Sequence, residues 1–224
     1  MYELFIGTFV TFFVVIDPLG IAPIFAVMTD GASAAFKRRM VIRASLTSGI
    51  ILLIFAFLGN GLLSALGISM LAFKTAGGVL LFMIALEMIF EKRTERREKK
   101  SEGLAHDLGQ VEGSEGNVIV ETDEDFEDIS VFPIAIPFIS GPGSIATIML
   151  LMSQHTGNLE EQGQIIMALL AALLSTVIIL LAASKIIGLL GHTIANAITR
   201  ILGVILAALA TQYIFDGIKG TFLG

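Results

Sequence analysis

Long apolar stretches separated by polar connections dominate this chain of 224 residues. A transmembrane α-helix needs about 20 apolar residues in a row to cross the hydrocarbon core of a bilayer. Stretches of that length occupy residues 4–28, 40–66, 71–90, 131–152, 165–190 and 194–223. The pattern therefore predicts an all-α, polytopic membrane protein with six transmembrane helices.

The longest polar stretch, residues 92–130, lies between the third and fourth predicted helices. It begins with a basic part (Lys92, Arg93, Arg96, Arg97, Lys99 and Lys100) and ends with an acidic part (Glu121, Asp123, Glu124, Asp125, Glu127 and Asp128). Dense charge and low hydrophobicity predict a mobile loop. We therefore divide the chain into a first three-helix unit over residues 1–91, this charged loop, and a second three-helix unit over residues 131–224.

The first and fourth predicted helices are interrupted near their middle by proline and glycine. The interruptions are Asp17-Pro18-Leu19-Gly20 and Ser140-Gly141-Pro142-Gly143, and these two helices contain all five prolines: Pro18, Pro23, Pro133, Pro137 and Pro142. Proline lacks a backbone N–H, and glycine permits conformations that end a helix. Irregular backbone survives at membrane depth only inside protein or beside water. We predict that helices one and four are broken at mid-membrane.

The two halves of the chain resemble each other. Residues 73–90 align with residues 199–216, which places Lys74 on Arg200 and Gly77 on Gly203. The breaks at Asp17 and Ser140 precede these segments by similar distances. Because each half has three helices, the second half enters the membrane from the opposite side, which predicts two inverted three-helix repeats. Chance resemblance between apolar helices is the alternative.

Lysine and arginine collect in the connections that follow the odd-numbered helices. They are Lys37, Arg38, Arg39 and Arg43 after the first helix, the basic part of the charged loop after the third, and Lys185 at the end of the fifth. Residues 60–70 and 154–164, after the second and fourth helices, contain none. The positive-inside rule predicts a cytoplasmic charged loop and both termini outside.

Paired broken helices in inverted halves point to a substrate site at the bilayer midplane. Each break offers half-helix N–H donors and carbonyl acceptors. Asp17 adds a carboxylate, whereas its counterpart Ser140 is neutral, and this asymmetry suits an amino-acid zwitterion. The predicted substrate-binding residues are Asp17, Pro18, Gly20, Pro23, Ser140, Gly141, Pro142, Gly143 and Ser144. The structural alternative is a pair of kinks, with Asp17 capping the half-helix that follows.

Four polar residues in the third and sixth helices are candidates for ion coupling or gating, namely Lys74, Glu87, Arg200 and Gln212. Each has a structural alternative. Lys74 and Arg200 can extend to the lipid headgroups, and Glu87 lies close to the basic part of the charged loop. Gln212 can hydrogen-bond a neighbouring helix.

Three motifs carry a resemblance that covers nearly the whole chain outside the charged loop. They are DPLGIAPIF, KTAGGVLLFMIALEMI and FPIAIPFISGPGSIATI, in this order and spacing. Together they resemble the MarC family of integral membrane proteins, which is related in pattern to amino-acid exporters of the LysE type. The resemblance implies a six-span protein of the inner (plasma) membrane and the transport of small neutral amino acids.

Composition narrows the function further. Hydrophobic residues make up 55% of the chain and cysteine is absent, which removes thiolate and cysteine–zinc chemistry. His106, His155 and His192 lack ligand spacing, and no nucleotide-binding motif is present, so we expect no metal site, no cofactor except a coupling ion, H⁺ or Na⁺, and no enzyme activity. Expected partners are the lipid bilayer, the substrate and, as one option, further copies in a homo-oligomer, with no nucleic acid.

The prediction is thus a secondary active transporter of small neutral amino acids of the glycine and alanine class. It would be coupled to protons or Na⁺ and work by alternating access, with the two halves rocking about a substrate clasped by the broken helices. Two alternatives stay open. One is a non-transporting scaffold that docks a cytoplasmic protein through residues 92–130, and the other is an exporter of another small metabolite.

Overall fold

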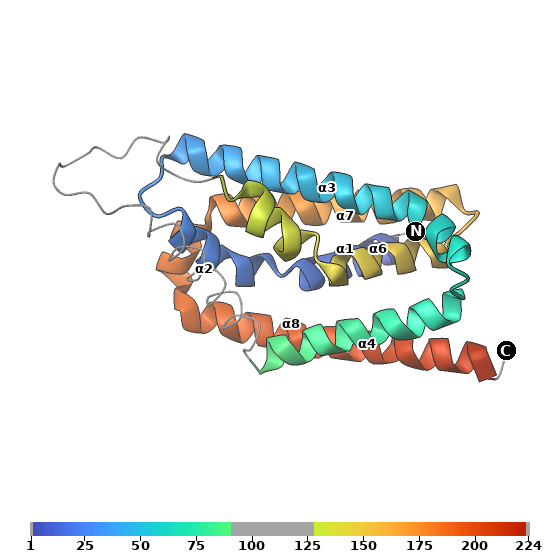
Figure 1. The fold of residues 1–224 in the computed structure, drawn as a ribbon. Coiled ribbons are helices and arrows are strands. Elements are labelled where there is room, and N and C mark those ends of the chain that lie inside the picture. The colour runs from blue at the N-terminus through green and yellow to red at the C-terminus, as the bar shows by residue number, and fades with distance from the viewer. Residues whose placement is uncertain (1, 91–127, 223–224) are drawn as a thin grey trace, which may run out of the picture.

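The computed structural model describes residues 2–90 and 128–222, with residues 184 and 186–193 described by their backbone alone (Figure 1). All regular structure in these ranges is helical. The elements are α1 (Tyr2–Ile16), α2 (Pro18–Met28), α3 (Ala34–Ala65), α4 (Met70–Ile89), the π-helix η1 (Ser130–Ile139), α6 (Pro142–Gln154), α7 (Leu159–Leu181) and α8 (Ala183–Phe222). Most of the predicted charged loop, 92–127, lies outside the described residues.

Local polar residues set where several long helices begin. Ser33 accepts a hydrogen bond from the Phe36 amide at the start of α3, and Ser69 does the same for Ala72 at the start of α4. A side-chain acceptor of this kind satisfies one of the amides that a helix N-terminus leaves unpaired. The short polar connections between apolar stretches therefore also define the helix ends.

The predicted all-helical, polytopic membrane fold is confirmed. Within the described residues, five helices are long and apolar enough to span a membrane: Tyr2–Met28, Ala34–Ala65, Met70–Ile89, Leu159–Leu181 and Ile194–Phe222. The pair of η1 and α6, bent by 54° at its break, makes the sixth candidate. The breaks in the first and fourth spans lie where proline and glycine predicted them.

The fifth helix ends earlier than predicted, whereas the sixth spanning segment begins at Ile194 as predicted. The fifth helix ends at Leu181 rather than residue 190, and α8 begins at Ala183. Lys185 therefore lies in the first turn of α8, where its amide bonds the Ala182 carbonyl. Neither proline nor glycine interrupts residues 176–186, so the sequence carries no stop signal there.

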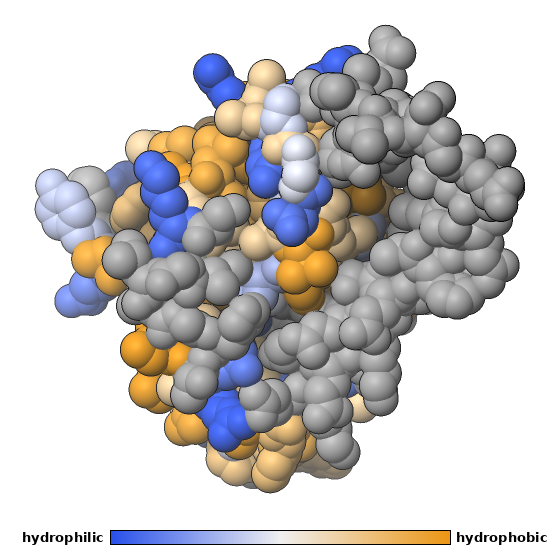
Figure 2. Space-filling model, turned by 90° about the vertical axis from the view of Figure 1, so that its left-hand side faces the viewer, coloured by the Kyte–Doolittle hydropathy of each residue, from blue (hydrophilic) through white to orange (hydrophobic). Residues whose placement is uncertain are grey.

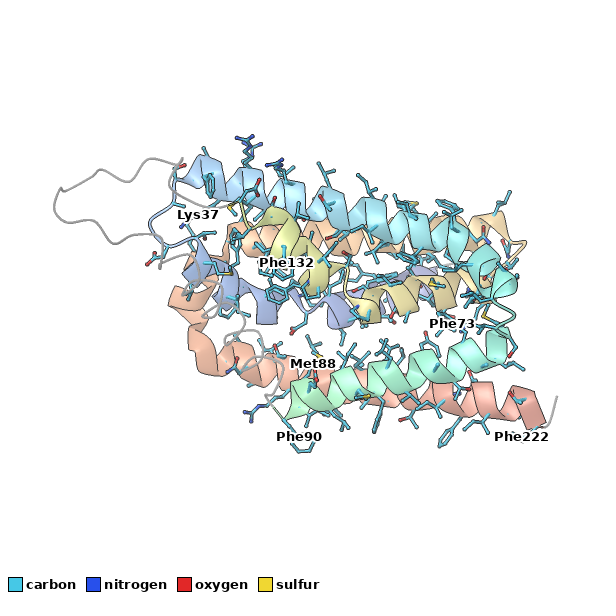
Figure 3. All side chains as sticks on the ribbon, viewed as in Figure 1. Lys37, Phe73, Met88, Phe90, Phe132 and Phe222 are labelled. Carbon is cyan, nitrogen blue, oxygen red and sulfur yellow. The ribbon has the colours of Figure 1, made fainter. Side chains whose placement is uncertain are left out.

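The helices form two groups of unequal size. The core bundle consists of α1, α2, α3, η1, α6 and α7, which share one buried apolar cluster. The α4–α8 pair lies along one side of it, with the two helices antiparallel (Figure 1). A second, smaller cluster joins this pair to α1, and Met88 lies in it, between the pair and the core bundle (Figure 3).

Large apolar side chains cover the outward faces of the long helices. On α3 these include Ile50, Phe57 and Leu58, of which Phe57 and Leu58 are each 63% exposed. Similar side chains face outward on α4, α7 and α8. An apolar surface this extensive is incompatible with water and indicates contact with lipid.

The two ends of the molecule differ in their connections. Both termini lie at one end, and the α2–α3 connection and the start of η1 lie at the other, where Lys37 is labelled (Figures 1 and 3). Hydrophilic side chains are visible on that second end among apolar ones (Figure 2). The connections that follow the odd-numbered spans therefore share one end, as the sequence predicts.

Candidate functional site

The first break is a single residue, Asp17, between α1 and α2. Its backbone is left-handed (φ 55°, ψ 62°), a conformation that aspartate tolerates better than most residues. The backbone bonds continue on both sides, since the Asp17 amide donates to the Phe13 carbonyl and the Ile21 amide to the Asp17 carbonyl. Pro18 starts α2 and needs no partner because it has no N–H. The chain turns here at little cost in hydrogen bonds.

The Asp17 carboxylate caps α2. It accepts a hydrogen bond from the Gly20 amide at 3.1 Å, which confirms the structural role predicted for it. A Cβ on Gly20 would lie 2.1 Å from the nearer carboxylate oxygen, so glycine is required for the carboxylate to occupy this position. The order Asp-Pro-x-Gly thus encodes a cap, a helix start and the space for the capping group.

Asp17 also faces another helix. Its side chain is 1% exposed, and Thr199 of α8 donates a hydrogen bond to the same carboxylate at 3.3 Å. A carboxylate at this depth needs polar partners, because burial in an apolar medium penalises the charged form. Sequence reasoning missed Thr199, since one threonine in an apolar helix carries no signal of its own.

The second break is built differently. Within η1, Phe132 and Ile136 adopt extended backbone, and each precedes a proline with a cis peptide bond. A residue before proline is driven away from helical geometry by steric contact with the proline ring. The repeated proline spacing therefore replaces a regular α-helix by an irregular turn that leads into the break.

Hydroxyl groups satisfy the backbone around this turn. The Ser140 amide and hydroxyl both donate to the Ala135 carbonyl, at 2.9 and 2.8 Å, and Ser48 of α3 donates to the same oxygen at 3.3 Å. Ser144 donates to the Ile139 carbonyl at 2.7 Å. Both predicted site serines therefore use their hydroxyl hydrogens on backbone carbonyls, and their oxygens remain as acceptors.

By its position in the helix, Gly141 rather than Ser140 corresponds to Asp17, because each is the N-cap of the helix that follows its break. Gly141 is the N-cap of α6 and is followed by Pro142, as Asp17 is followed by Pro18. No side chain among the described residues caps α6. A Cβ on Gly141 would lie 2.4 Å from the Pro137 carbonyl oxygen, so no side chain fits there. Glycine is neutral like serine, so the charge asymmetry between the breaks stays as predicted, and the N-cap of α6 also lacks a hydroxyl.

The two breaks meet at the boundary between the core bundle and the α4–α8 pair. A Cβ on Gly143 would lie 2.5 Å from Ile84 of α4 and 3.3 Å from Val15 of α1, and Asp17 reaches α8 through Thr199. The predicted site residues are buried except Pro142, which is exposed. Pro18 and Pro23 lie in α2, which contacts η1, α7 and α8. The structure thus gathers both breaks into one enclosed region.

Comparison with known proteins identifies the family. Residues 2–222 match the profile of the MarC family integral membrane proteins. The chain belongs to the MarC family. Its relatives include a UPF0056 membrane protein of Methanocaldococcus jannaschii, 36% identical over 97% of this chain and 88% of that protein, and UPF0056 membrane protein YvbG of Bacillus subtilis, 32% identical over 99% of this chain and 97% of that protein. No solved structure matches the chain.

Two of the gating candidates in this MarC family protein lie together, away from the breaks. Lys74 of α4 forms an ion pair of 3.0 Å with Asp216 of α8, and Gln212 donates to the other carboxylate oxygen at 2.8 Å. The Lys74 ammonium also lies 5.9 Å from the ring centre of Tyr213. Ten residues of α4, about 15 Å, separate Lys74 from Ile84 beside the second break. Asp216 was missed by sequence reasoning, although its spacing of four from Gln212 is a usable signal.

The other two candidates lie on the far side of the breaks from Lys74. Arg200 follows Thr199 directly, so it lies one residue from the threonine that contacts Asp17, and its side chain is exposed. Glu87 is half-buried on α4, three residues beyond Ile84. Of the four candidates, these two are nearer the breaks.

Proposed function

We propose that this MarC family protein is a secondary active transporter of small neutral amino acids. The observation that carries the proposal is a buried carboxylate, Asp17, at a helix break, close to the uncapped N-terminus of the half-helix α6. The substrate ammonium would bind the carboxylate, and the substrate carboxylate would bind the first amides of α6. The alternative in which Asp17 only caps α2 accounts for one break but not for the pairing of both.

The polar groups support a ligand of both charges. A carboxylate within a membrane span is costly and is usually associated with a substrate, an ion or a proton. At α6, the missing cap leaves the Gly143 and Ser144 amides without a side-chain acceptor among the described residues. A helix N-terminus in that condition favours an anion, through its free N–H groups and its partial positive charge.

The packing supports a small ligand. Gly20, Gly141 and Gly143 each adjoin a group that leaves no space for a Cβ. The backbone at both breaks is therefore in direct contact with its neighbours, and any space opened by a modest movement is narrow. Glycine and alanine fit such a space better than branched or aromatic amino acids.

The helix contacts support the inverted repeat. Contacts of α1 with α7 are matched by contacts of η1 with α3, and those of α2 with α8 by those of α6 with α4. A Cβ on Gly203 would meet Ala85 and Ile89, and one on Gly78 would meet Ala210 and Ile214. The same shift in residue number relates Gly78 to Gly203, Ala85 to Ala210 and Ile89 to Ile214. Gly203 is therefore paired with Gly78, and not with Gly77 as in the sequence alignment.

The helix contacts favour a different transport movement from the predicted rocking of the two halves. The two halves interleave, because α3 packs on η1, α6 and α7 of the other half. Rocking of one half against the other would break that core. The α4–α8 pair has its own smaller cluster with α1, so we propose that this pair moves against the core bundle and opens the breaks to alternate sides. By the positive-inside rule, the basic residues near Lys37 favour a cytoplasmic location for that end, and we propose this orientation, with the termini outside.

Reconstituted protein tests the function. Proteoliposomes should accumulate labelled glycine or alanine under a proton or Na⁺ gradient, and Asp17→Asn should lose most of that flux while Asp30→Asn, an exposed carboxylate in the α2–α3 connection, retains it. Because the substrate ammonium binds this carboxylate, Asp17→Asn should also lose substrate exchange measured without a gradient. The proposal fails if folded wild-type protein moves neither amino acid under either gradient.

A further inference from the structure

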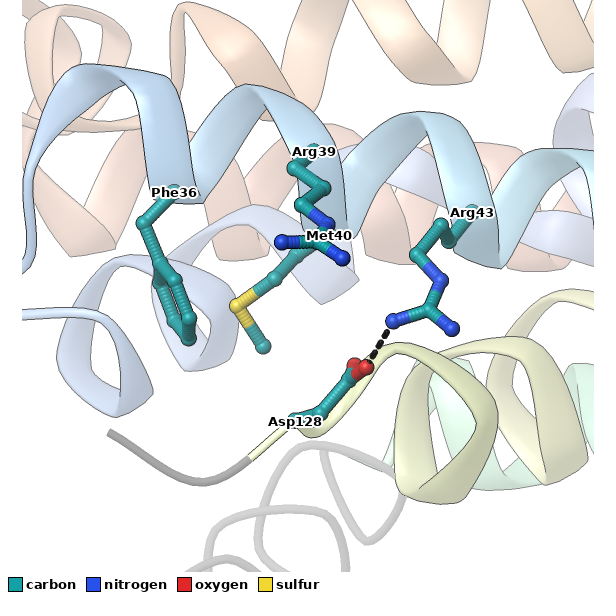
Figure 4. A pocket seen from close by; sticks show the side chains of 5 residues that line it. All are labelled: Phe36, Arg39, Met40, Arg43 and Asp128. Atoms are coloured by element: carbon teal, nitrogen blue, oxygen red, sulfur yellow. Dashed lines mark hydrogen bonds and ion pairs between the residues drawn. The ribbon is translucent and has the colours of Figure 1, made fainter. Parts of the chain in front are cut away.

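A cavity separate from the breaks lies where α3 approaches the start of η1. Its volume is about 160 Å³ and its walls are Phe36, Arg39, Met40, Arg43 and Asp128 (Figure 4). The four α3 residues repeat at helical spacing and so share one face of the helix. At roughly 30 Å³ for each water molecule in the liquid, the space equals about five waters, which is enough for a small polar group.

The described residues that line the cavity are two arginines and one aspartate, together with an apolar floor. Two arginines oppose one carboxylate, and Asp128 is already engaged by Arg43 and by the Ser130 hydroxyl and amide. Arg39 acts on Asp128 through its charge. Met40 is 2% exposed and Phe36 is half-buried. The cavity therefore presents the Arg39 guanidinium beside sulfur and aromatic surface.

The position of the cavity determines which anion can reach it. The apolar part of α3 begins at Met40, so the arginines lie where the helix enters the lipid, at the same end as Lys37 and Arg38. At that level the abundant anions are phosphodiesters of lipid headgroups. Guanidinium groups bind phosphate oxygens in pairs, and the apolar floor suits the glycerol and first acyl carbons.

We propose that this cavity binds the phosphate headgroup of an anionic phospholipid, held by Arg39 and Arg43. Asp128 orients Arg43 through its ion pair, and Arg39 supplies a second positive charge. This site stands apart from the substrate region and does not depend on the transport proposal. Anionic lipid would then tie the start of η1 to α3 and stabilise the lead-in to the second break.

The test uses full-length protein in detergent with a short-chain lipid, dioctanoyl-phosphatidylglycerol. We expect the thermal unfolding midpoint to rise saturably with this lipid and not with the phosphatidylcholine of equal chain length. Arg39→Gln should weaken the apparent affinity at least about fivefold, the effect of one basic residue at a membrane surface. Arg38→Gln, the same charge removal on the adjacent residue outside the cavity, should leave it nearly unchanged.

Three results would overturn the proposal. The first is an equal response to phosphatidylcholine, which indicates general detergent–lipid effects. The second is an equal loss in Arg38→Gln and Arg39→Gln, which indicates diffuse surface charge rather than a site. The third is saturation by inorganic phosphate at the same concentration as by the lipid, which indicates a soluble anion as the occupant. The circular dichroism spectrum of each variant is compared with that of the wild type, so that a loss of binding caused by misfolding is recognised.

Discussion

The geometry at the first break makes a quantitative prediction for Gly20→Ala. The new methyl group would lie 2.1 Å from Asp17 Oδ2 and 2.8 Å from its Cγ, so the carboxylate must leave its position. Losing the cap costs about 1–2 kcal/mol, and leaving a buried polar group without its partner costs about 1–3 kcal/mol more. We expect Gly20→Ala to destabilise the protein by about 2–5 kcal/mol.

A matched glycine provides the control. Gly77 is buried in α4, yet a Cβ there would meet no atom within 4 Å. Gly77→Ala should be neutral or stabilising by up to about 1 kcal/mol, because alanine favours a helix interior more than glycine does. Both variants can be compared by denaturant unfolding in mixed micelles, followed by circular dichroism.

A double-mutant cycle separates this clash from other effects of the substitution. In an Asp17→Ala background the carboxylate is absent, so Gly20→Ala should cost less than about 1 kcal/mol. The reasoning is refuted if Gly20→Ala is as stable as Gly77→Ala. It is refuted equally if Gly20→Ala costs the same with and without Asp17.

Three further predictions concern other contacts. Gly143→Ala places a methyl group 2.5 Å from Ile84 Cδ1, the movable end of a half-buried side chain. It should lower the free energy of unfolding by at most about 1 kcal/mol, the low end of overpacking costs. Ile84→Ala should remove most of that loss, and an equal loss in both backgrounds would contradict this. Lys74→Met should lower the free energy of unfolding by about 1 kcal/mol, because it removes the ion pair with Asp216. If the losses from Lys74→Met and Asp216→Asn simply add in the double variant, the two residues do not interact. The Ser130 hydroxyl, with the nearby arginines, holds the pKa of Asp128 below its ordinary 3.8. The ionised Asp128 carboxylate should therefore stabilise the fold above about pH 4, and this contribution should fade as the pH falls through the lowered pKa. A difference in unfolding midpoint between wild type and Asp128→Asn that persists at pH 2 would contradict this.

The broken helices could be predicted from the sequence because their signal is local. Proline and glycine disrupt a helix wherever they stand, so both breaks follow from the residues alone. The cap formed by Asp17 followed from the same reasoning. The sequence pairing of Asp17 with Ser140 differs by one residue from the pairing of the two N-caps. Pro18 follows Asp17 as Pro142 follows Gly141, and this shared proline is a signal that the pairing did not use.

The groups that complete the site are non-local and could not be predicted in this way. Thr199 lies 182 positions from Asp17 along the chain, and only the packing of α2 on α8 brings them together. The partition into a core bundle and an α4–α8 pair likewise depends on contacts between distant helices. Six apolar stretches indicate that the helices pack, but they carry little information on which helix packs on which.

The central claim is that a small zwitterion binds between the two breaks. A structure determined with bound glycine or alanine tests it most directly. We predict ligand density with its ammonium group within hydrogen-bond distance of the Asp17 carboxylate and its carboxylate at the first amides of α6. Density at another place in the protein, or no ligand density between the breaks at saturating concentrations of both amino acids, would contradict the claim.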